Sequence, residues 1–285
     1  MRPPYITPES LEQFIDQALE EDIRDGDHSS LASIPAEASN SAYLLMKDSG
    51  VIAGMELAQI IFRKLDPNMQ FTDVVADGTA VKKGDVIMRI HGNSRSILSA
   101  ERLVLNCMQR MSGIATHTQY LNSLIGEHKA RLLDTRKTTP NFRMMQKWAV
   151  VIGGGVNHRY GLFDMIMLKD NHIDFAGGIA NAVSATVAYL EKTGKDLKIE
   201  VETRNLDEVQ QALYTGKVDR IMLDNMSPED MKKAVALIAG RSETEASGGI
   251  TESTIESVAA SGVDFISVGA LTHSAKSLDI SLKAE

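Results

Sequence analysis

Apolar and polar residues alternate with two different periods along this chain of 285 residues, and the change of period indicates two kinds of architecture. Up to about residue 115, "TPESLEQFIDQALEED" and "MELAQIIFRKL" have the spacing of amphipathic helices. The segments "AYLLMKDSGVIAG" and "GTAVKKGDVIMRIHG" each predict two strands around a turn. From Ile97 to Ile125 apolar residues recur at helical spacing, which predicts one long helix.

From Ala130 onward, short apolar runs alternate with helical patterns. The candidate strands are "RLLDTR", "MIMLKD", "KIEVET", "RIMLDN", "TEASGG" and "FISVGA". Strands that alternate with helices are typical of a parallel sheet covered by helices. Because six strands are clear and a complete barrel needs eight, we expect either an incomplete α/β barrel or a barrel with weakly marked strands.

The amino-acid composition and net charge limit the kinds of function that this chain could have. A hydrophobic content of 43% with 24% charged residues is ordinary for a globular protein, and the net charge of −8 argues against nucleic acid or an anionic membrane as partner. The single cysteine, Cys107, excludes an internal disulfide and an all-cysteine metal site. The N-terminal segment lacks the apolar stretch of a signal peptide, so we expect a cytoplasmic protein.

Polar residues gather where the predicted strands end, which is where β/α barrels carry their chemistry. Between Asp134 and His172 there are six cations against three acids, although the chain as a whole is acidic. A local basic region in an anionic protein suits a small polyanionic ligand. The strand-end residues are Arg136, Lys137, Lys169, Asp170, Glu202, Asp224, Asn225, Ser247, Gly248, Gly249 and Gly269.

Three details refine this site. The last two strands end in "SGG" and "VGA", and glycines before a helix start are typical of a phosphate site, although a glycine pair can also be a tight turn. Glu202 and Asp224 could hold Mg²⁺ or sugar hydroxyls, or form structural ion pairs. His158 lacks the spacing of a zinc ligand, so we expect it to hydrogen-bond a ligand.

Longer motifs resemble those of a known family. "EEDIRDGDHSS", "SAERLVLNCMQRMSGIAT", "DTRKTTPNFR", "KWAVVIGGGVNHRYGLFDMIMLKDNHI", "IEVET", "IMLDN", "EASGGI" and "ISVGALTHSAKSLDISL" occur in this order. Together they resemble the quinolinate phosphoribosyltransferases over nearly the whole chain.

The resemblance implies an α/β fold: an N-terminal α/β sandwich domain over residues 1–115, which the tail 274–285 could join, and an open, incomplete α/β barrel over 116–273. It implies a homodimer, which could assemble further. The family's reaction joins quinolinate to phosphoribosyl pyrophosphate with Mg²⁺, and it releases pyrophosphate and carbon dioxide while forming nicotinate mononucleotide.

The resemblance also implies roles for single residues. Arg136, His158, Arg159 and Lys169 would bind the two carboxylates of quinolinate, and Arg102 would reach the site of the neighbouring subunit. Lys137, Lys169, Glu202 and Asp224 would act in catalysis, and the two acids would hold Mg²⁺ mostly through the substrate. The remaining binding residues would be Thr135, Ser247, Gly248, Gly249, Val268, Gly269, Ala270 and His273.

The chain departs from the family pattern at Arg24, Leu103 and Asn141. Three alternatives stay open: a phosphoribosyltransferase-like protein of molybdate-transport operons with another small anionic substrate, a lyase that uses Lys169 as a Schiff base, and a swinging-arm carrier with its lysine at Lys47. The charges of Arg102, Arg136, Arg159 and Lys169 favour a dicarboxylate over the first. The polar neighbours of Lys169 argue against the second, and the helix "MELAQIIFRKL" interrupts the carrier pattern.

Overall fold

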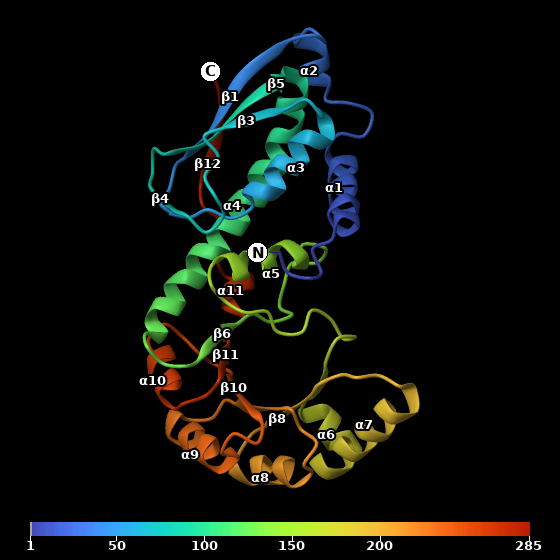
Figure 1. Ribbon diagram of the computed structural model, residues 1–285, viewed down its shortest axis with the longest axis vertical. Helices are drawn as coiled ribbons and strands as arrows, with labels where there is room; N and C mark the ends of the chain where they lie inside the picture. The colour runs from blue at the N-terminus through green and yellow to red at the C-terminus, as the bar shows by residue number, and fades with distance from the viewer. Residues whose placement is uncertain (1) are drawn as a thin grey trace. The chain divides into compact units, whose positions relative to one another are not determined.

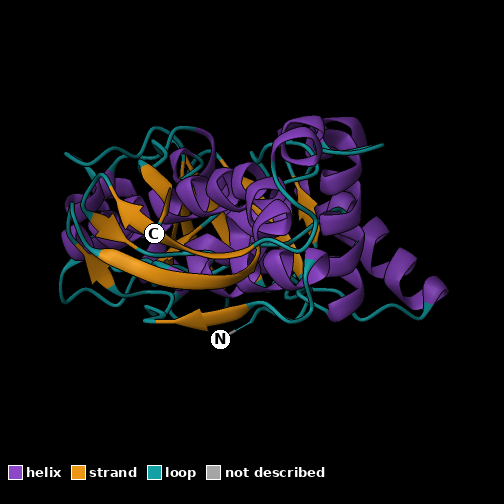
Figure 2. Cartoon of the chain, turned by 90° about the horizontal axis from the view of Figure 1, so that it is seen from above, coloured by secondary structure: helices purple, strands orange, loops and turns teal. Residues whose placement is uncertain are grey.

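The structure, a computed structural model, describes residues 2–285 and divides into two units that alternate along the chain (Figures 1 and 2). Unit 1 contains residues up to 119 together with 138–154 and 271–285. Unit 2 contains residues 120–137 and 155–270. The fold class predicted from the sequence, α/β with a small N-terminal sheet and an open parallel sheet, is confirmed. The domain boundaries at residues 115 and 273 remain predictions.

Unit 1 contains an antiparallel sheet with the strand order β12-β1-β5-β3 and a separate pair, β2-β4. These strands are β1 (Ser39–Met46), β2 (Gly50–Val51), β3 (Gln70–Thr72), β4 (Ala80–Val81), β5 (Val86–Asn93) and β12 (Ile280–Ala284). The helices are α1 (Pro8–Asp22), α2 (His28–Ser33), α3 (Met55–Leu65), α5 (Arg143–Ile152) and most of α11 (Ala270–His273). The long predicted helix is α4 (Ser94–Ile125), which begins in unit 1 and ends in unit 2.

The helices of unit 1 begin and pack as their sequences predict. The hydroxyl of Thr7 accepts from the backbone N–H of Ser10, and the Ser10 hydroxyl accepts from the N–H of Thr7, so a capping box starts α1. In α3, apolar side chains on one face, including Leu57, Ile61 and Phe62, are fully buried. A Cβ at Gly113 of α4 would lie 1.9 Å from the carbonyl oxygen of Lys276, so only glycine allows the C-terminal segment to approach this helix.

Unit 2 is built on a six-stranded parallel sheet with the order β6-β11-β10-β9-β8-β7. The strands are β6 (Arg131–Leu133), β7 (Ile166–Leu168), β8 (Ile199–Thr203), β9 (Arg220–Asp224), β10 (Glu243–Ser247) and β11 (Phe265–Ser267). They match the six strands predicted. Helices α6 (Asp170–Ala176), α7 (Ile179–Thr193), α8 (Leu206–Tyr214), α9 (Pro228–Ile238) and α10 (Ile255–Ala260) connect them. β6 and β7 are the two ends of this open sheet.

The register of the sheet places charged residues in rows on one face. Glu200 lies beside Arg220, which lies beside Glu243, and two residues further along Glu202 and Glu245 both lie beside Met222. Because alternate residues of a strand point to the same face, these rows continue to Asp224 and Ser247 at the strand ends. The site therefore has a lower layer of charges beneath its strand-end residues.

Among the described residues, no single helix has both the length and the apolar character needed to cross a membrane. Helices α6 and α7 together satisfy length and composition as a pair bent by 91°.

Candidate active site

Two predicted anion-binding arginines, Arg136 and Arg159, lie close enough in unit 2 to affect each other. Burial lowers the pKa of Arg159, and the positive charge of Arg136 lowers it further, while Glu200 partly offsets both effects. Two guanidinium groups that repel each other in a half-buried position are stabilised when an anion binds between them. The structure thus brings together two members of the predicted dicarboxylate group.

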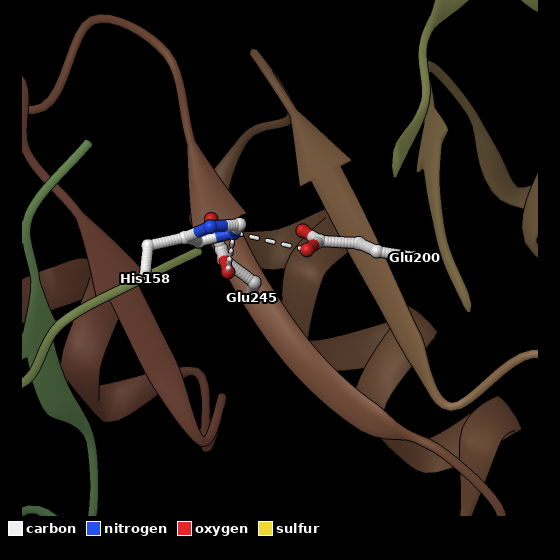
Figure 3. A group of neighbouring side chains, drawn as sticks. All are labelled: His158, Glu200 and Glu245. Atoms are coloured by element: carbon white, nitrogen blue, oxygen red, sulfur yellow. Dashed lines mark ion pairs between the residues drawn. The ribbon is translucent and has the colours of Figure 1, made fainter. Parts of the chain in front are cut away.

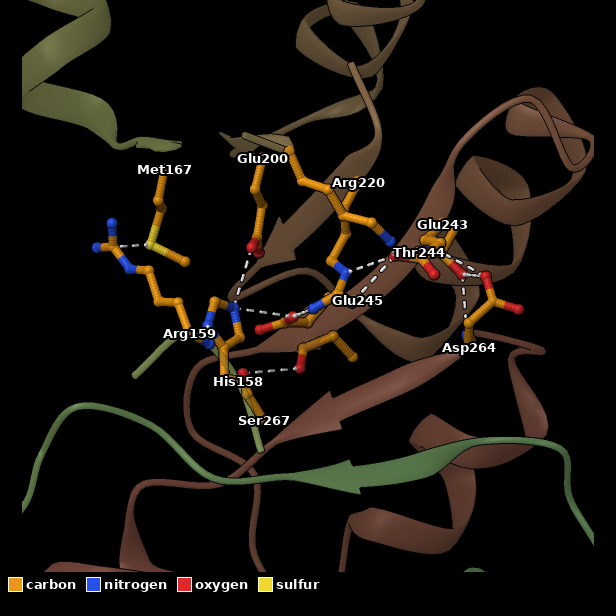
Figure 4. A network of polar contacts seen from close by, with 12 residues as sticks. His158, Arg159, Met167, Glu200, Arg220, Glu243, Thr244, Glu245, Asp264 and Ser267 are labelled. Atoms are coloured by element: carbon orange, nitrogen blue, oxygen red, sulfur yellow. Dashed lines mark hydrogen bonds and ion pairs between the residues drawn. The ribbon is translucent and has the colours of Figure 1, made fainter. Parts of the chain in front are cut away.

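The side chain of Arg159 is held at the start of β7. Its Nη1 donates to the carbonyl oxygen of Met165 at 3.2 Å, and its Nη2 lies 3.5 Å from the sulfur of Met167 (Figure 4). Met165 directly precedes the edge strand and Met167 lies within it, so the two contacts give the guanidinium a defined direction.

His158 is buried, and its ring points into unit 2. Nε2 lies 2.9 Å from a carboxylate oxygen of Glu200 and 3.3 Å from one of Glu245, and the two acids come from β8 and β10 (Figure 3). Nδ1 accepts a hydrogen bond of 2.7 Å from the backbone N–H of Arg159. Both ring nitrogens therefore contact the protein, and a direct contact from His158 to the substrate stays a prediction.

The buried carboxylates shift the titration of this group. Burial lowers the pKa of His158, but the hydrogen bonds and charges of Glu200 and Glu245 outweigh it and raise that pKa to about 9. The N–H of Arg159, which donates to Nδ1, opposes a second proton on the ring. Whichever effect is larger, a proton remains on Nε2, the nitrogen that faces the carboxylates.

Sequence reasoning missed Glu200, Glu245 and Arg220, which lie inside predicted strands. Glu200 and Glu245 are fully buried, and Arg220 donates to Glu245 at 3.0 Å and to Glu243 at 3.0 Å. A partial signal existed at Glu200, which stands between the apolar residues Ile199 and Val201, because buried charges are kept only with partners. Asp134, the first residue of the motif "DTRKTTPNFR", is also fully buried, and the sequence alone assigns it no role.

The predicted acids Glu202 and Asp224 also lie together, at the ends of β8 and β9. Burial raises the pKa of Glu202, Asp224 raises it further, and Lys169 opposes this shift. Lys169, although exposed, therefore lies within electrostatic reach of the two acids. A carboxylate of Asp224 accepts from the side-chain amide of Asn225 at 2.6 Å. Two oxygen donors whose charges repel each other fit a hard cation such as Mg²⁺.

The predicted phosphate end consists of Ser247, Gly248 and Gly249 after β10. Both glycines have left-handed backbone, with φ of +89° and +62°. Consecutive residues of this kind leave backbone N–H groups exposed to an anion. The backbone N–H of Val268 donates to the carbonyl oxygen of Leu133 at 3.0 Å, so it is not available to an anion. Gly269 and Ala270 follow Val268 after the end of β11.

The other residues predicted for the site, Thr135, Lys137, Arg102 and His273, lie outside the groups described above. The hydroxyl of Thr135 accepts from the N–H of Lys137 at 3.0 Å, which forms a tight turn after β6 and leaves the Lys137 side chain exposed. Arg102 and His273 belong to unit 1. Arg102 is exposed on α4, where it lines a pocket of about 410 Å³ with Asn106, Arg110 and other side chains of unit 1.

Two of the departures from the family pattern have an unusual backbone. Arg24 and Asn141 have left-handed φ angles of 48° and 61°, a conformation that favours glycine. Asparagine adopts this conformation more readily than arginine does, so Arg24 is the more strained of the two.

Family models match almost the whole chain. Residues 27–112 match the quinolinate phosphoribosyl transferase N-terminal domain, and residues 114–283 match the C-terminal domain of the same family. The chain is 48% identical over 298 residues to nicotinate-nucleotide pyrophosphorylase (carboxylating), chloroplastic, from Oryza sativa, covering 99% of this chain and 80% of that one. It is 46% identical to a mitochondrial quinolinate phosphoribosyltransferase (decarboxylating) of Nicotiana tabacum, covering 100% of this chain and 85% of that one.

Solved structures agree with these matches. NadC from Streptococcus pyogenes superimposes with a TM-score of 0.91 at 40% identity, covering 98% of this chain and 99% of that one. The nicotinate-nucleotide pyrophosphorylase from Francisella tularensis has a TM-score of 0.89 at 41% identity, covering 98% of both chains. The sequence, the fold and the charged strand ends thus lead to one conclusion, that this chain belongs to the quinolinate phosphoribosyltransferase family.

Proposed function

We propose that this chain transfers the phosphoribosyl group of phosphoribosyl pyrophosphate to quinolinate and decarboxylates the product, a step of NAD biosynthesis. The observation that carries the proposal is that Arg136 lies within electrostatic reach of Arg159, in the same unit as Glu202 and Asp224, whose charges repel each other. Paired cations suit a dicarboxylate, and paired acids suit a ribose with a developing positive charge.

The cations would bind and orient quinolinate. Arg136 and Arg159 would each accept a carboxylate in their planar forks, and Lys169 would add a point charge. Holding both carboxylates directs the pyridine nitrogen at the anomeric carbon of the ribose, which is catalysis by positioning. Lys137, whose side chain is exposed after β6, would face the diphosphate or the substrate.

The acids would act on the ribose. As the bond to pyrophosphate breaks, the anomeric carbon gains oxocarbenium character, and the carboxylates of Glu202 and Asp224 would stabilise that charge and bind the hydroxyls. Both residues would also hold Mg²⁺, mostly through the substrate, because they supply the oxygen donors that it prefers. When bound, Mg²⁺ would neutralise charge on the pyrophosphate oxygens.

The glycine turn would bind the 5′-phosphate. Ser247, Gly248 and Gly249 would contribute backbone N–H groups and one hydroxyl, and Val268, Gly269 and Ala270 would complete the binding set. The left-handed φ values of the two glycines support this role.

Decarboxylation would follow transfer. Once the ring nitrogen carries the ribose it is cationic, so it stabilises the electron pair that remains at C2 when the carbon–carbon bond to the carboxylate breaks and carbon dioxide leaves. A proton from water or a site residue then bonds to C2 and gives nicotinate mononucleotide.

The assembly and the location belong to the proposal as well. A homodimer would allow Arg102, exposed on α4, to enter the site of the partner subunit and bind the substrate there. A cytoplasmic location is expected for this chain, although plant relatives are named chloroplastic or mitochondrial. The Schiff-base alternative is disfavoured because Lys169 is exposed and lies near Glu202.

The experiment supplies quinolinate, phosphoribosyl pyrophosphate and Mg²⁺ to the purified protein and follows nicotinate mononucleotide and carbon dioxide. Product from quinolinate but not from nicotinate is expected, and Arg136→Ala and Arg102→Ala should abolish it. No product from quinolinate would remove the proposed substrate. Release of carbon dioxide without ribosyl transfer would contradict the order of steps.

A further inference from the structure

Three buried side chains of unit 2, those of His158, Glu200 and Glu245, form a cluster in which the two glutamates have no role in the proposed reaction. Glu200 and Glu245 have no exposed surface, and both direct a carboxylate oxygen at Nε2 of His158 (Figure 3). The three residues come from β8, from β10 and from the loop before β7, so the cluster joins separate parts of the unit.

Burying the charges of this cluster is energetically unfavourable, so a contribution to stability does not explain why the cluster is present. Both oxygens of Glu200 are buried without a hydrogen bond of good geometry, although one lies 2.9 Å from the imidazole. A buried carboxylate that is poorly hydrogen-bonded destabilises a fold relative to an apolar side chain of the same size. A requirement other than packing is therefore expected to retain Glu200.

Arg220 completes the charge balance beneath the cluster. Its guanidinium bonds Glu245 at 3.0 Å and Glu243 at 3.0 Å and lies 4.2 Å from the ring centroid of Phe265 (Figure 4). Burial and the charge of Glu245 raise the pKa of the Glu200 carboxyl, whereas His158 and Arg220 outweigh burial and lower that of Glu245.

A metal ion is the first alternative, since His158, Glu200 and Glu245 are the one group of described residues whose ligand atoms are close enough to share one. The imidazole already contacts both carboxylates, and Arg220 already supplies a positive charge to Glu245. A divalent ion would add charge to a group that is already neutralised, so the contacts favour an ion-pair cluster.

The imidazole connects this cluster to Arg159. Nε2 faces the two glutamates, while Nδ1 accepts from the backbone N–H of Arg159 at 2.7 Å. On the other side, the Asp134 carboxylate accepts from the backbone N–H of His158 at 2.9 Å and from the Asn157 amide at 2.5 Å. If the ring turned away, the glutamates would lose their imidazole contact and the Arg159 N–H would lose its acceptor.

We propose that Glu200 and Glu245 are positioning residues for quinolinate binding, which act by clamping the His158 ring and thereby fixing the backbone and side chain of Arg159. The inference rests on the proposed function, because Arg159 is taken to hold a quinolinate carboxylate. It assigns the two glutamates no contact with the substrate and no chemical step.

The test compares Glu200→Gln and Glu245→Gln with Glu243→Gln as the matched control. Glu243 also bonds Arg220 from β10, but it is partly exposed and its other ion pair is with Lys198. Initial rates are measured while quinolinate and phosphoribosyl pyrophosphate are varied separately. We expect Glu200→Gln, which removes the negative charge that faces the imidazole, to raise KM for quinolinate about tenfold, with KM for the other substrate unchanged. Glu243→Gln should match the wild type.

A second measurement separates positioning from general damage. If Glu200 acts through His158, the double variant Glu200→Gln/His158→Gln should be no worse for quinolinate than His158→Gln alone. Calorimetric titration with quinolinate gives a readout of binding that does not depend on turnover. Should one glutamine variant fail to fold, the other glutamate and the same cycle test the same clamp.

The outcomes are distinct. Equal rises of both KM values, additive effects in the double variant, or a Glu243→Gln defect as large as that of Glu200→Gln would overturn the inference. One metal ion per chain in the purified wild type that is lost from Glu200→Gln would overturn it in favour of a metal centre. A wild type that does not turn over quinolinate refutes the proposed function instead, whereas an active wild type with an unchanged Glu200→Gln refutes only the clamp.

Discussion

Gly248 lies directly against the side chain of Asn225, so that a Cβ on this glycine would fall 2.3 Å from Oδ1 of Asn225. Asn225 in turn donates its side-chain amide to Asp224 and its backbone N–H to the carbonyl of Ser247 at 2.9 Å. The glycine turn after β10 and the acid at the end of β9 are thus connected through one asparagine.

This relationship predicts the effect of Gly248→Ala. The new methyl group would displace Asn225, and alanine would also be strained at φ +89°. We expect a loss of about 2 kcal/mol in stability and a rise of KM for phosphoribosyl pyrophosphate, measured by urea unfolding and initial rates. Gly249→Ala is the control, because a Cβ there meets no described atom within 4 Å and only the strain at φ +62° remains. Equal defects in both variants would exclude the contact with Asn225 as the cause.

A second prediction concerns Mg²⁺ and Asp224. Replacing this residue with asparagine removes one of two charges that we propose attract the ion, so the Mg²⁺ concentration for half-maximal activity should rise about tenfold. KM for quinolinate should stay at the wild-type value when Mg²⁺ is saturating, because the predicted carboxylate-binding cations are unchanged. Asp230→Asn is a control, since Asp230 is partly exposed at the start of α9 and pairs with Lys233. An unaltered Mg²⁺ requirement in Asp224→Asn would remove Asp224 from the proposed metal site.

A third prediction concerns pH and Asp264. Burial raises the pKa of this carboxyl, but Lys129 at 2.8 Å and the N–H and hydroxyl of Thr244 outweigh it, so the pKa lies below its ordinary value of 3.8. A carboxyl whose folded pKa is depressed stabilises the fold above its unfolded pKa, and this contribution is lost as pH falls through the folded pKa. Asp264→Asn should therefore be less stable than the wild type at pH 7, and the difference should shrink below about pH 4.

Urea midpoints at several pH values measure this difference. Lys129→Met separates the exposed ion pair from the Thr244 hydrogen bonds, and it should have the smaller effect because surface pairs contribute little. A difference that stays constant from pH 7 to pH 3 would show that the charge of Asp264 is not responsible.

A fourth prediction concerns Arg24, which has a left-handed φ of 48°. Glycine at this position removes the steric strain but adds freedom to the unfolded chain, so Arg24→Gly should stabilise the protein by about 1 kcal/mol or less. Arg24→Ala keeps the strain and should bring no gain. Thermal denaturation compares the three proteins, and a midpoint of Arg24→Gly at or below that of Arg24→Ala would contradict the argument.

The sequence predicts the parallel sheet well because its strands are short apolar runs that begin and end at turn residues. β8 and β9 lie where "KIEVET" and "RIMLDN" place them, and the acids Glu202 and Asp224 fall at their ends. The sequence does not predict β3 and β12 as strands, since Gln70–Thr72 has only three residues and Ile280–Ala284 pairs with a strand more than 230 residues away. Pairing over such a distance leaves no local pattern.

The sequence predicts only part of the candidate active site, because the site too depends partly on contacts between distant segments. The end of a strand can be recognised in the sequence by the change from apolar to polar residues, and this change identifies Arg136 and Glu202 as strand-end residues. Glu200 and Glu245 are inside their strands. An isolated acid at such a position is expected to face solvent, unless its partners, here His158 and Arg220, are known. Their role depends on contacts between strands, and one strand considered alone does not contain that information.

The pairing of β12 with β1 has a consequence for synthesis on the ribosome. β1 is made early, but the strand that covers one of its edges, Ile280–Ala284, is made only after every residue of unit 2. During translation β1 therefore exposes an unpaired edge, the kind of surface that invites association with other chains. We expect unit 1 to complete its sheet after unit 2 has emerged, so the part of the chain that is translated first finishes folding last.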